Sequence, residues 1–254
     1  MRAFRAPMNE LGEFQEIKNA MKRNKGLLQV TGCIDSQKAH LIDSLSAEAP
    51  LRLIVAANDL RAKEIYENYK LFDRNAMLFP AKDFIFYQAD VRSGLIDAQR
   101  LGVIKALAEG SATTVVLTVT ALMNHMMPFG QWKEAVCTVQ VGDELILEEW
   151  KTRLIQLGYE RMPQAENPGQ FALRGGILDL FPMTGETGVR IELWGDEVDS
   201  IRSYDPQTQR SLENLESIRI FPASEVIRTQ ERTLDALKKI REEGKKTEKS
   251  FVKT

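Results

Sequence analysis

Hydrophobic positions in the first half of the chain form short runs, and segments of helical spacing separate these runs. Four apolar runs predict strands at 27–31, 51–57, 76–79 and 114–119. The segments between them predict helices at 36–45, 59–71 and 93–108. Alternation of strand and helix is typical of a parallel sheet covered by helices. The pattern therefore predicts an α/β lobe at residues 1–127.

The pattern changes from about residue 128, where strands follow one another across glycine-rich turns. A strand is expected at 136–141 and a helix at 143–157. The apolar stripe of that helix consists of Leu147, Trp150, Leu154 and Leu157. Between residues 171 and 206 apolar and polar positions alternate as in half-buried strands. This order predicts a second, smaller α+β domain at residues 128–222.

Residues 223–254 are expected to form a helix and a lysine-rich end. Ser224 suits the N-cap of a helix that runs to about residue 243. The apolar stripe of this helix consists of Leu234, Leu237 and Ile240. The residues after it carry few apolar side chains and cannot bury much surface. We therefore expect a frayed end, in a piece of a longer protein.

Composition and charge narrow the class of protein. The chain has 254 residues, of which 43% are hydrophobic and 28% charged, as in soluble globular proteins. Its net charge of -2 argues against a protein that coats nucleic acid. Cys33 and Cys137 lack metal-ligand spacing, so we expect free thiols in a reducing compartment. Neither a signal peptide nor an apolar run of about 18 residues is present, which predicts a cytoplasmic protein without membrane contact.

A candidate phosphate loop, GCIDSQKA, stands between the first expected strand and the following helix. Gly32 and Lys38 match the pattern G-x-x-x-x-G-K-[ST], but Gln37 replaces the second glycine. Ala39 replaces the hydroxyl that would bind Mg²⁺, and Asp35 adds negative charge to the cradle. Two interpretations remain, weak ATP binding through Lys38 or a surface turn with a solvated lysine. Under neither do we expect hydrolysis or a metal site, and the second, which we favour, leaves this chain without a bound cofactor.

Four segments resemble the N-terminal module of the bacterial transcription-repair coupling factors, the Mfd family, which is itself similar to the helicase UvrB. They are VTGCIDSQKAHLI at 30–42, LFPAKDFIFYQADVRSGLIDAQRLGVIKAL at 78–107, GYERMPQAENPGQFALRGGILDLFP at 158–182, and RIELWGDEVDSIRSYDPQTQRS directly after a short loop. The resemblance implies a helicase-like lobe with a degenerate P-loop and an inserted α+β domain. It also implies that residues 223–254 begin the return to the lobe.

The resemblance further separates this chain from UvrB itself. UvrB has an intact Walker A loop and a long aromatic hairpin that clamps DNA. Here the chain passes through Phe84 and Tyr87 directly into the helix expected near Ser93, which leaves no room for such a hairpin. The resemblance therefore implies a module without ATPase activity and without damage verification.

The function implied is recruitment of UvrA to a stalled RNA polymerase, in transcription-coupled nucleotide excision repair. In both families the small α+β domain docks UvrA, and Arg161 and Arg174 match basic residues of that docking face. Phe171 is a third candidate, because its alternation with Leu173 allows either the face or the core. Ala172 stands where UvrB has another arginine.

Other activities of the full-length relatives are implied for parts C-terminal to this region. These are ATP and Mg²⁺ binding, DNA translocation, and binding of RNA polymerase and DNA. The alternative function is a UvrB-type helicase fragment that binds ATP through Lys38 or binds DNA through a local basic groove.

Overall fold

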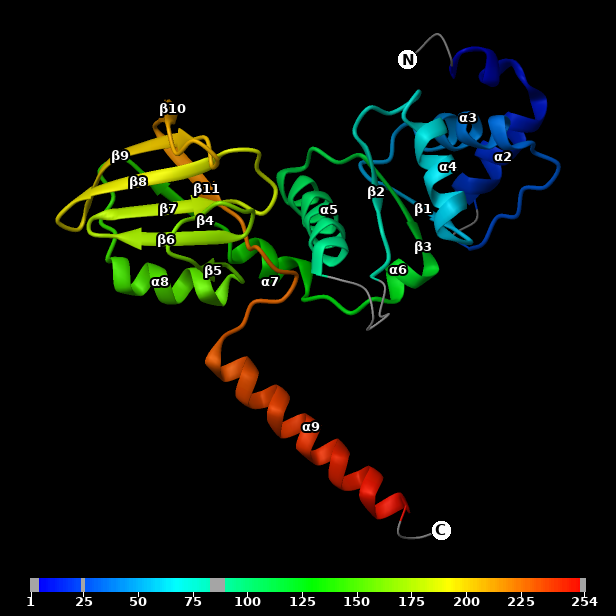
Figure 1. Cartoon of the computed structure of the whole chain (residues 1–254). Coiled ribbons are helices and arrows are strands. Elements are labelled where there is room, and N and C mark those ends of the chain that lie inside the picture. The colour runs from blue at the N-terminus through cyan, green and yellow to red at the C-terminus, as the bar shows by residue number, and fades with distance from the viewer. Residues whose placement is uncertain (1–4, 24–25, 83–89, 252–254) are drawn as a thin grey trace. The chain divides into compact units, whose positions relative to one another are not determined.

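A computed structural model describes residues 5–23, 26–82 and 90–251 (Figure 1). The chain divides into two compact units, residues 1–124 and 125–254. The predicted mixture of α and β structure is confirmed, with one parallel sheet and one mostly antiparallel sheet. The domain limits expected at residues 127 and 222 stay predictions. Among the described helices, none has the length and apolar character needed to span a membrane.

The first unit is built on a parallel sheet whose strand order is β1-β3-β2. Its strands are β1 (Arg52–Ala56), β2 (Ala76–Phe79) and β3 (Thr114–Thr118). Its helical segments are η1 (Pro7–Glu10), α2 (Gly12–Arg23), α3 (Asp35–Leu45), α4 (Asp59–Tyr69), α5 (Asp90–Glu109) and α6 (Val119–Met123).

Helices pack on both faces of this sheet. Alternate residues of a strand point to opposite sides, so neighbouring residues of the central strand β3 contact different helices. Val116 of β3 packs in a cluster with residues of α3 and α4, including Ala39 and Tyr69. Its neighbour Val115 packs in a second cluster with Val103 of α5. Every residue of β3 is buried, as expected of the middle strand in an α/β sheet.

The strand expected at 27–31 is wrong, whereas the other elements predicted in this unit form within a few residues of their expected bounds. Residues 26–31 pair with no strand in the described part of the chain, and Leu27 is 92% exposed. Apolar alternation supplies only a tendency, and a strand also needs a neighbour to bond to. The connection that contains Phe84 and Tyr87 lies outside the described residues.

The second unit is built on a six-stranded sheet of order β10-β9-β8-β7-β6-β5, in which only the β5–β6 pair is parallel. Its strands are β5 (Glu160–Arg161), β6 (Gln170–Arg174), β7 (Ile177–Phe181), β8 (Gly188–Trp194), β9 (Glu197–Tyr204) and β10 (Ser211–Leu215). The unit also contains α7 (Phe129–Glu134), β4 (Cys137–Gln140), α8 (Leu147–Gln156), β11 (Ser217–Ile220) and α9 (Gln230–Phe251), and β4 pairs with β11.

One face of the six-stranded sheet forms the core of this unit. Its apolar residues are buried and comprise Phe171, Leu178, Leu180, Val189, Ile191 and Ile201. Leu154 of α8 and Ile220 of β11 are buried as well, and Tyr159 Oη donates to Phe221 O at 2.8 Å. This face is therefore closed to solvent.

The helix expected from residue 143 begins later, at Leu147. The preceding residues pair with the start of β9 instead, since Leu145 N donates to Asp196 O at 2.6 Å. Val198 N in turn donates to Asp143 O at 2.9 Å. Residues with a helical pattern thus satisfy their backbone groups against a distant strand, which the local pattern does not reveal.

The helix expected from Ser224 begins at Gln230. The carbonyl of Ser224 accepts a hydrogen bond from Trp132 Nε1 at 3.0 Å. Residue 224 is therefore bonded to α7 of the second unit, and α9 starts later in the chain. Thr229 Oγ1 accepts from Arg232 N at 3.3 Å, as an N-cap side chain does. The helix extends past its predicted end, and its three stripe residues Leu234, Leu237 and Ile240 are between 50% and 66% exposed.

Gly188 is predicted to be essential for packing between β8 and β9. A Cβ at this position would overlap the ring of Tyr204, which is fully buried and donates through Oη to Ala165 O at 3.0 Å. We expect Gly188→Ala to lower the free energy of unfolding by about 1–3 kcal/mol, measured by urea denaturation. Gly130→Ala is the control, because a Cβ in α7 meets no atom within 4 Å. Equal losses in the two variants would contradict the prediction.

Candidate functional site

The second face of the six-stranded sheet carries charged side chains. Strand register places Ala172 beside Asp179 and Asp179 beside Arg190. The same register places Arg174 beside Ile177 and Ile177 beside Glu192. Because paired residues project to the same side, these residues share one face. We call it the charged face, and its charged members are Arg174, Asp179, Arg190 and Glu192, together with Arg202 and Glu197 of β9, which pair with Arg190 and Trp194 of β8.

Asp179 stands at the centre of the charged face with a side chain that is only 1% exposed. Its carboxylate accepts hydrogen bonds from Arg190 Nε at 2.6 Å and from Arg190 Nη2 at 2.9 Å. It also accepts one from Arg174 Nη2 at 2.5 Å. Two guanidinium groups thus compensate the charge of one buried carboxylate, as a buried ion requires.

Arg190 and Arg174 differ in how much of the side chain is exposed to solvent. Arg190 is 16% exposed, and its guanidinium lies 5.1 Å from the ring centroid of Tyr204. Its hydrogen bonds with Asp179 raise the pKa of Arg190. Arg174 is 48% exposed and reaches Asp179 through one nitrogen. Arg174 therefore presents an oriented cation to solvent, with donors left for another carboxylate.

A second ion pair continues the charged face toward β9. Arg202 Nη2 lies 3.2 Å from Glu192 Oε2, and Ser200 Oγ donates to the same oxygen at 3.2 Å. About a third of each charged side chain is exposed, so this pair contributes little to stability. Arg174 is the most exposed arginine among those of the charged face.

Arg161 is exposed but does not share the charged face. It lies in β5, at the edge of the sheet, and pairs in parallel register with Phe171. Residues side by side in a parallel pair project to the same side, which here is the core side. There its charge contributes to the lowered pKa of Glu148 in α8, after the larger effect of a hydrogen bond from Lys151. The structure thus separates Arg161 from Arg174.

The prediction that Phe171 is a surface contact needs correction. Phe171 is fully buried, opposite Leu180 of β7 and within the core face. Alternation with Leu173 allowed Phe171 to lie either on the exposed face or in the core, and in the structure it lies in the core. Asp179 was not among the predicted site residues, although a single carboxylate inside the apolar run ILDLF marks it in the sequence.

The charged side chains of the degenerate phosphate loop pair with each other and with an arginine of α4. Lys38 Nζ lies 2.9 Å from Asp35 Oδ1, and Asp35 also pairs with Arg61 of α4. Hydrogen bonds from Arg61 and Lys38 lower the pKa of Asp35 to about 2, so the carboxylate stays charged. Gln37 Oε1 accepts from Ile34 N at 3.2 Å, the group a phosphate would otherwise approach.

Gly32 and Ala39, two further positions of the loop, have structural roles. Gly32 is exposed with φ +83, a conformation that suits glycine in a tight turn. Ala39 is buried in the apolar cluster of α3 and α4, so the position of the missing hydroxyl serves packing.

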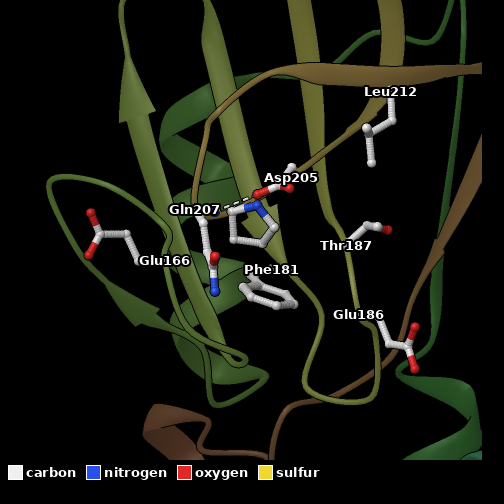
Figure 2. A pocket seen from close by; sticks show the side chains of 8 residues that line it. Glu166, Phe181, Glu186, Thr187, Asp205, Gln207 and Leu212 are labelled. Atoms are coloured by element: carbon white, nitrogen blue, oxygen red, sulfur yellow. Dashed lines mark hydrogen bonds between the residues drawn. The ribbon is translucent and has the colours of Figure 1, made fainter.

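A hollow at the other end of the sheet is lined by apolar, polar and acidic residues (Figure 2). Phe181, Pro206 and Leu212 line it, together with Glu166, Glu186, Thr187, Asp205 and Gln207. Asp205 Oδ1 accepts from Gln207 N at 2.8 Å and from Thr208 N at 3.0 Å, which lowers the pKa of Asp205. The Asp205 carboxylate thus stabilises the turn formed by residues 205–208. Within the described ranges no group of three His, Cys, Asp or Glu could hold a metal ion.

Removal of the Asp179 charge tests the architecture of the charged face. We expect Asp179→Asn to lower the free energy of unfolding by about 1–3 kcal/mol, because two guanidinium groups lose their shared anion. Glu192→Gln is the matched control and should cost no more than about 0.5 kcal/mol, since that pair is exposed. Both values come from urea denaturation. A cost for Asp179→Asn as small as that of the control would contradict the role given to the buried carboxylate.

Comparison with known proteins gives a family match and relatives that are transcription-repair-coupling factors. Residues 137–226 match the UvrB interaction domain family. The transcription-repair-coupling factor of Bacillus subtilis (strain 168) is 35% identical over 236 residues, which are 92% of this chain and 20% of the relative. That of Staphylococcus aureus (strain Mu50) is 30% identical over 227 residues, 88% of this chain and 19% of the relative.

The resemblance predicted from the four sequence segments is thereby confirmed. The chain spans about a fifth of the length of these relatives. The domain match includes every residue of the charged face, and it also includes Arg161. Over nearly its whole length the chain is therefore similar to one part of the transcription-repair-coupling factors, and its residues 137–226 match the UvrB interaction domain.

Proposed function

We propose that this chain is a non-catalytic module that binds UvrA and, as part of a transcription-repair-coupling factor, recruits it to stalled RNA polymerase. The observation that carries the proposal is Arg174, an exposed guanidinium oriented by the buried Asp179 within the UvrB interaction domain match. An arginine whose conformation is fixed before binding loses less entropy when a partner carboxylate pairs with it. Such residues are typical of interface hot spots.

Arg161 is the second contact in this proposal. Arg161 lies in the edge strand β5, which is next to β6. Its side chain projects from the side of the sheet opposite to Arg174. A partner that contacts both arginines must therefore reach around the β5 edge of the sheet. This geometry fits a partner with a concave or two-part surface better than one with a flat surface.

Other activities are assigned to parts of the relatives outside this region. The relatives are about five times longer than the stretch aligned here. In our proposal, contacts with RNA polymerase and DNA and the use of ATP and Mg²⁺ belong to those parts. The helicase-like ancestry of the first unit, with the α+β domain as an insertion, belongs to the same proposal.

The proposal predicts loss of UvrA binding in two variants. We expect Arg161→Ala and Arg174→Ala each to weaken binding by about 1–3 kcal/mol, measured by isothermal titration of UvrA into the chain. Arg210→Ala is the control, because Arg210 is an exposed arginine at the opposite end of the sheet, between β9 and β10. Binding of both test variants with the affinity of the parent would overturn the assigned surface. Absence of any binding by the parent would overturn the function.

The proposal also predicts that ATP does not bind to the first unit. Lys38 is already paired with Asp35, and Gln37 bonds to the backbone at the start of α3. A ligand that binds the native state must raise the melting temperature by mass action. We expect no rise when ATP and Mg²⁺ are added at millimolar concentration, as followed by differential scanning fluorimetry. A rise that Lys38→Ala abolishes would favour the UvrB-type ATP-binding alternative instead.

A further inference from the structure

One tryptophan of the second unit is almost fully exposed. Trp194, the last residue of β8, is 84% exposed, whereas Trp132 is completely buried. Trp194 is the most exposed aromatic residue among those the structure describes. An indole in water forgoes the burial of a large apolar surface, and it forms a strong anchor where a partner supplies a pocket. Its exposure leaves the indole available to a partner.

Strand register places Trp194 near Arg174. The turn between β6 and β7 and the turn between β8 and β9 lie at the same end of the sheet. Leu193 N donates to Gly176 O at 2.8 Å, which joins the two turns directly. Arg174 and Trp194 lie two strands apart and are offset by two residues, so their Cα atoms are about 12 Å apart.

Alternation also places Trp194 on the charged face. Glu192 shares that face with Ile177 and Arg174, and Trp194 is two residues further along β8. The register of β8 and β9 shifts between Glu192 and Leu193, but the residue left unpaired is Asp199 of β9, so alternation along β8 continues to Trp194. Both side chains thus project from the same side of the sheet, where each is long enough to contact one partner surface. Trp194 therefore extends the surface of the proposed function rather than forming a separate one.

The backbone beneath Trp194 is held in place from two sides. Trp194 pairs with Glu197 across the turn, and Gly195 takes φ +66 within it. The tip is also tied to the segment before α8, because Leu145 N donates to Asp196 O at 2.6 Å. An anchor on a fixed backbone binds with a small entropy cost.

We propose that Trp194 is the aromatic anchor of the UvrA-binding surface, and that the partner offers it an apolar pocket beside a carboxylate for Arg174. This inference rests on the proposed function. The choice of partner rests on position, since Trp194 lies within residues 137–226, which match the UvrB interaction domain, and on the same face as Arg174.

Isothermal titration of UvrA into variants of the chain tests the anchor. We expect Trp194→Ala to weaken binding on the order of 30-fold, as removal of a hot-spot residue does. Trp194→Phe should lose less, because a smaller ring still enters the pocket. Ile155→Ala is the control, since Ile155 is 49% exposed on α8 and away from the charged face. It should bind within about twofold of the parent.

A second measurement keeps the result independent of folding. The chain is labelled with 5-fluorotryptophan, and Trp194→Phe identifies the ¹⁹F signal of Trp194. We expect unlabelled UvrA to shift this signal and to remove its solvent isotope effect, while the signal of buried Trp132 keeps its chemical shift. The urea midpoint of Trp194→Ala should equal that of the parent, because an exposed indole contributes little to folding.

The possible failures are distinguishable. If the parent binds UvrA and Arg174→Ala weakens binding but Trp194→Ala does not, the anchor is wrong and the proposed function stands. If the parent does not bind UvrA at all, the proposed function fails. If the ¹⁹F signal of Trp194 shifts with chain concentration in the absence of UvrA, a second copy covers the indole and the inference is overturned.

Discussion

The carboxylate of Asp179 is the constraint on which the charged face depends. A carboxylate that is removed from water is costly unless cations and hydrogen bonds compensate it. Two guanidinium groups do so here, and in doing so both take fixed conformations. One of them, Arg190, lies over the ring of Tyr204, and Tyr204 in turn holds the loop at Ala165 and fills the space beside Gly188. The other, Arg174, is left at the rim with most of its donors facing water.

This arrangement explains how a sheet that is apolar on one side can display a rigid cation on the other. The core face holds residues such as Phe171 and Leu178 in fully buried positions and fixes the register of the strands. A slip of one residue would exchange the two faces, so the register is strongly specified. The positions of Arg174 and Trp194 on the opposite face follow from that register. Binding residues on such strands are placed more accurately than residues on loops.

In the first unit, the segment that partly matches a phosphate loop has charged groups that pair with one another. The segment from Gly32 to Ala39 still leads into a helix beside the sheet. Asp35, Lys38 and Arg61 compensate one another, and Gln37 bonds to the backbone nitrogen that precedes the helix. The groups that would receive a phosphate therefore already have partners within the chain.

The sequence by itself determined the type and order of most elements, because helical and strand periodicities are local properties of the chain. It also determined the losses in the phosphate loop and the resemblance to transcription-repair coupling factors. It did not determine that residues 27–31 lack a strand partner, nor that residues before Leu147 pair with β9. These outcomes depend on neighbours that are distant in the chain.

The faces of the sheet were likewise decided only by tertiary structure. Alternation left Phe171 free to lie on either side, and pairing with Leu180 placed it in the core. Arg161 and Arg174 look equivalent as basic residues in neighbouring strands, yet the register projects them to opposite sides. The exposure of Trp194 and the burial of Asp179 have the same origin. A sequence records which residues alternate, whereas only the paired sheet decides which side is covered.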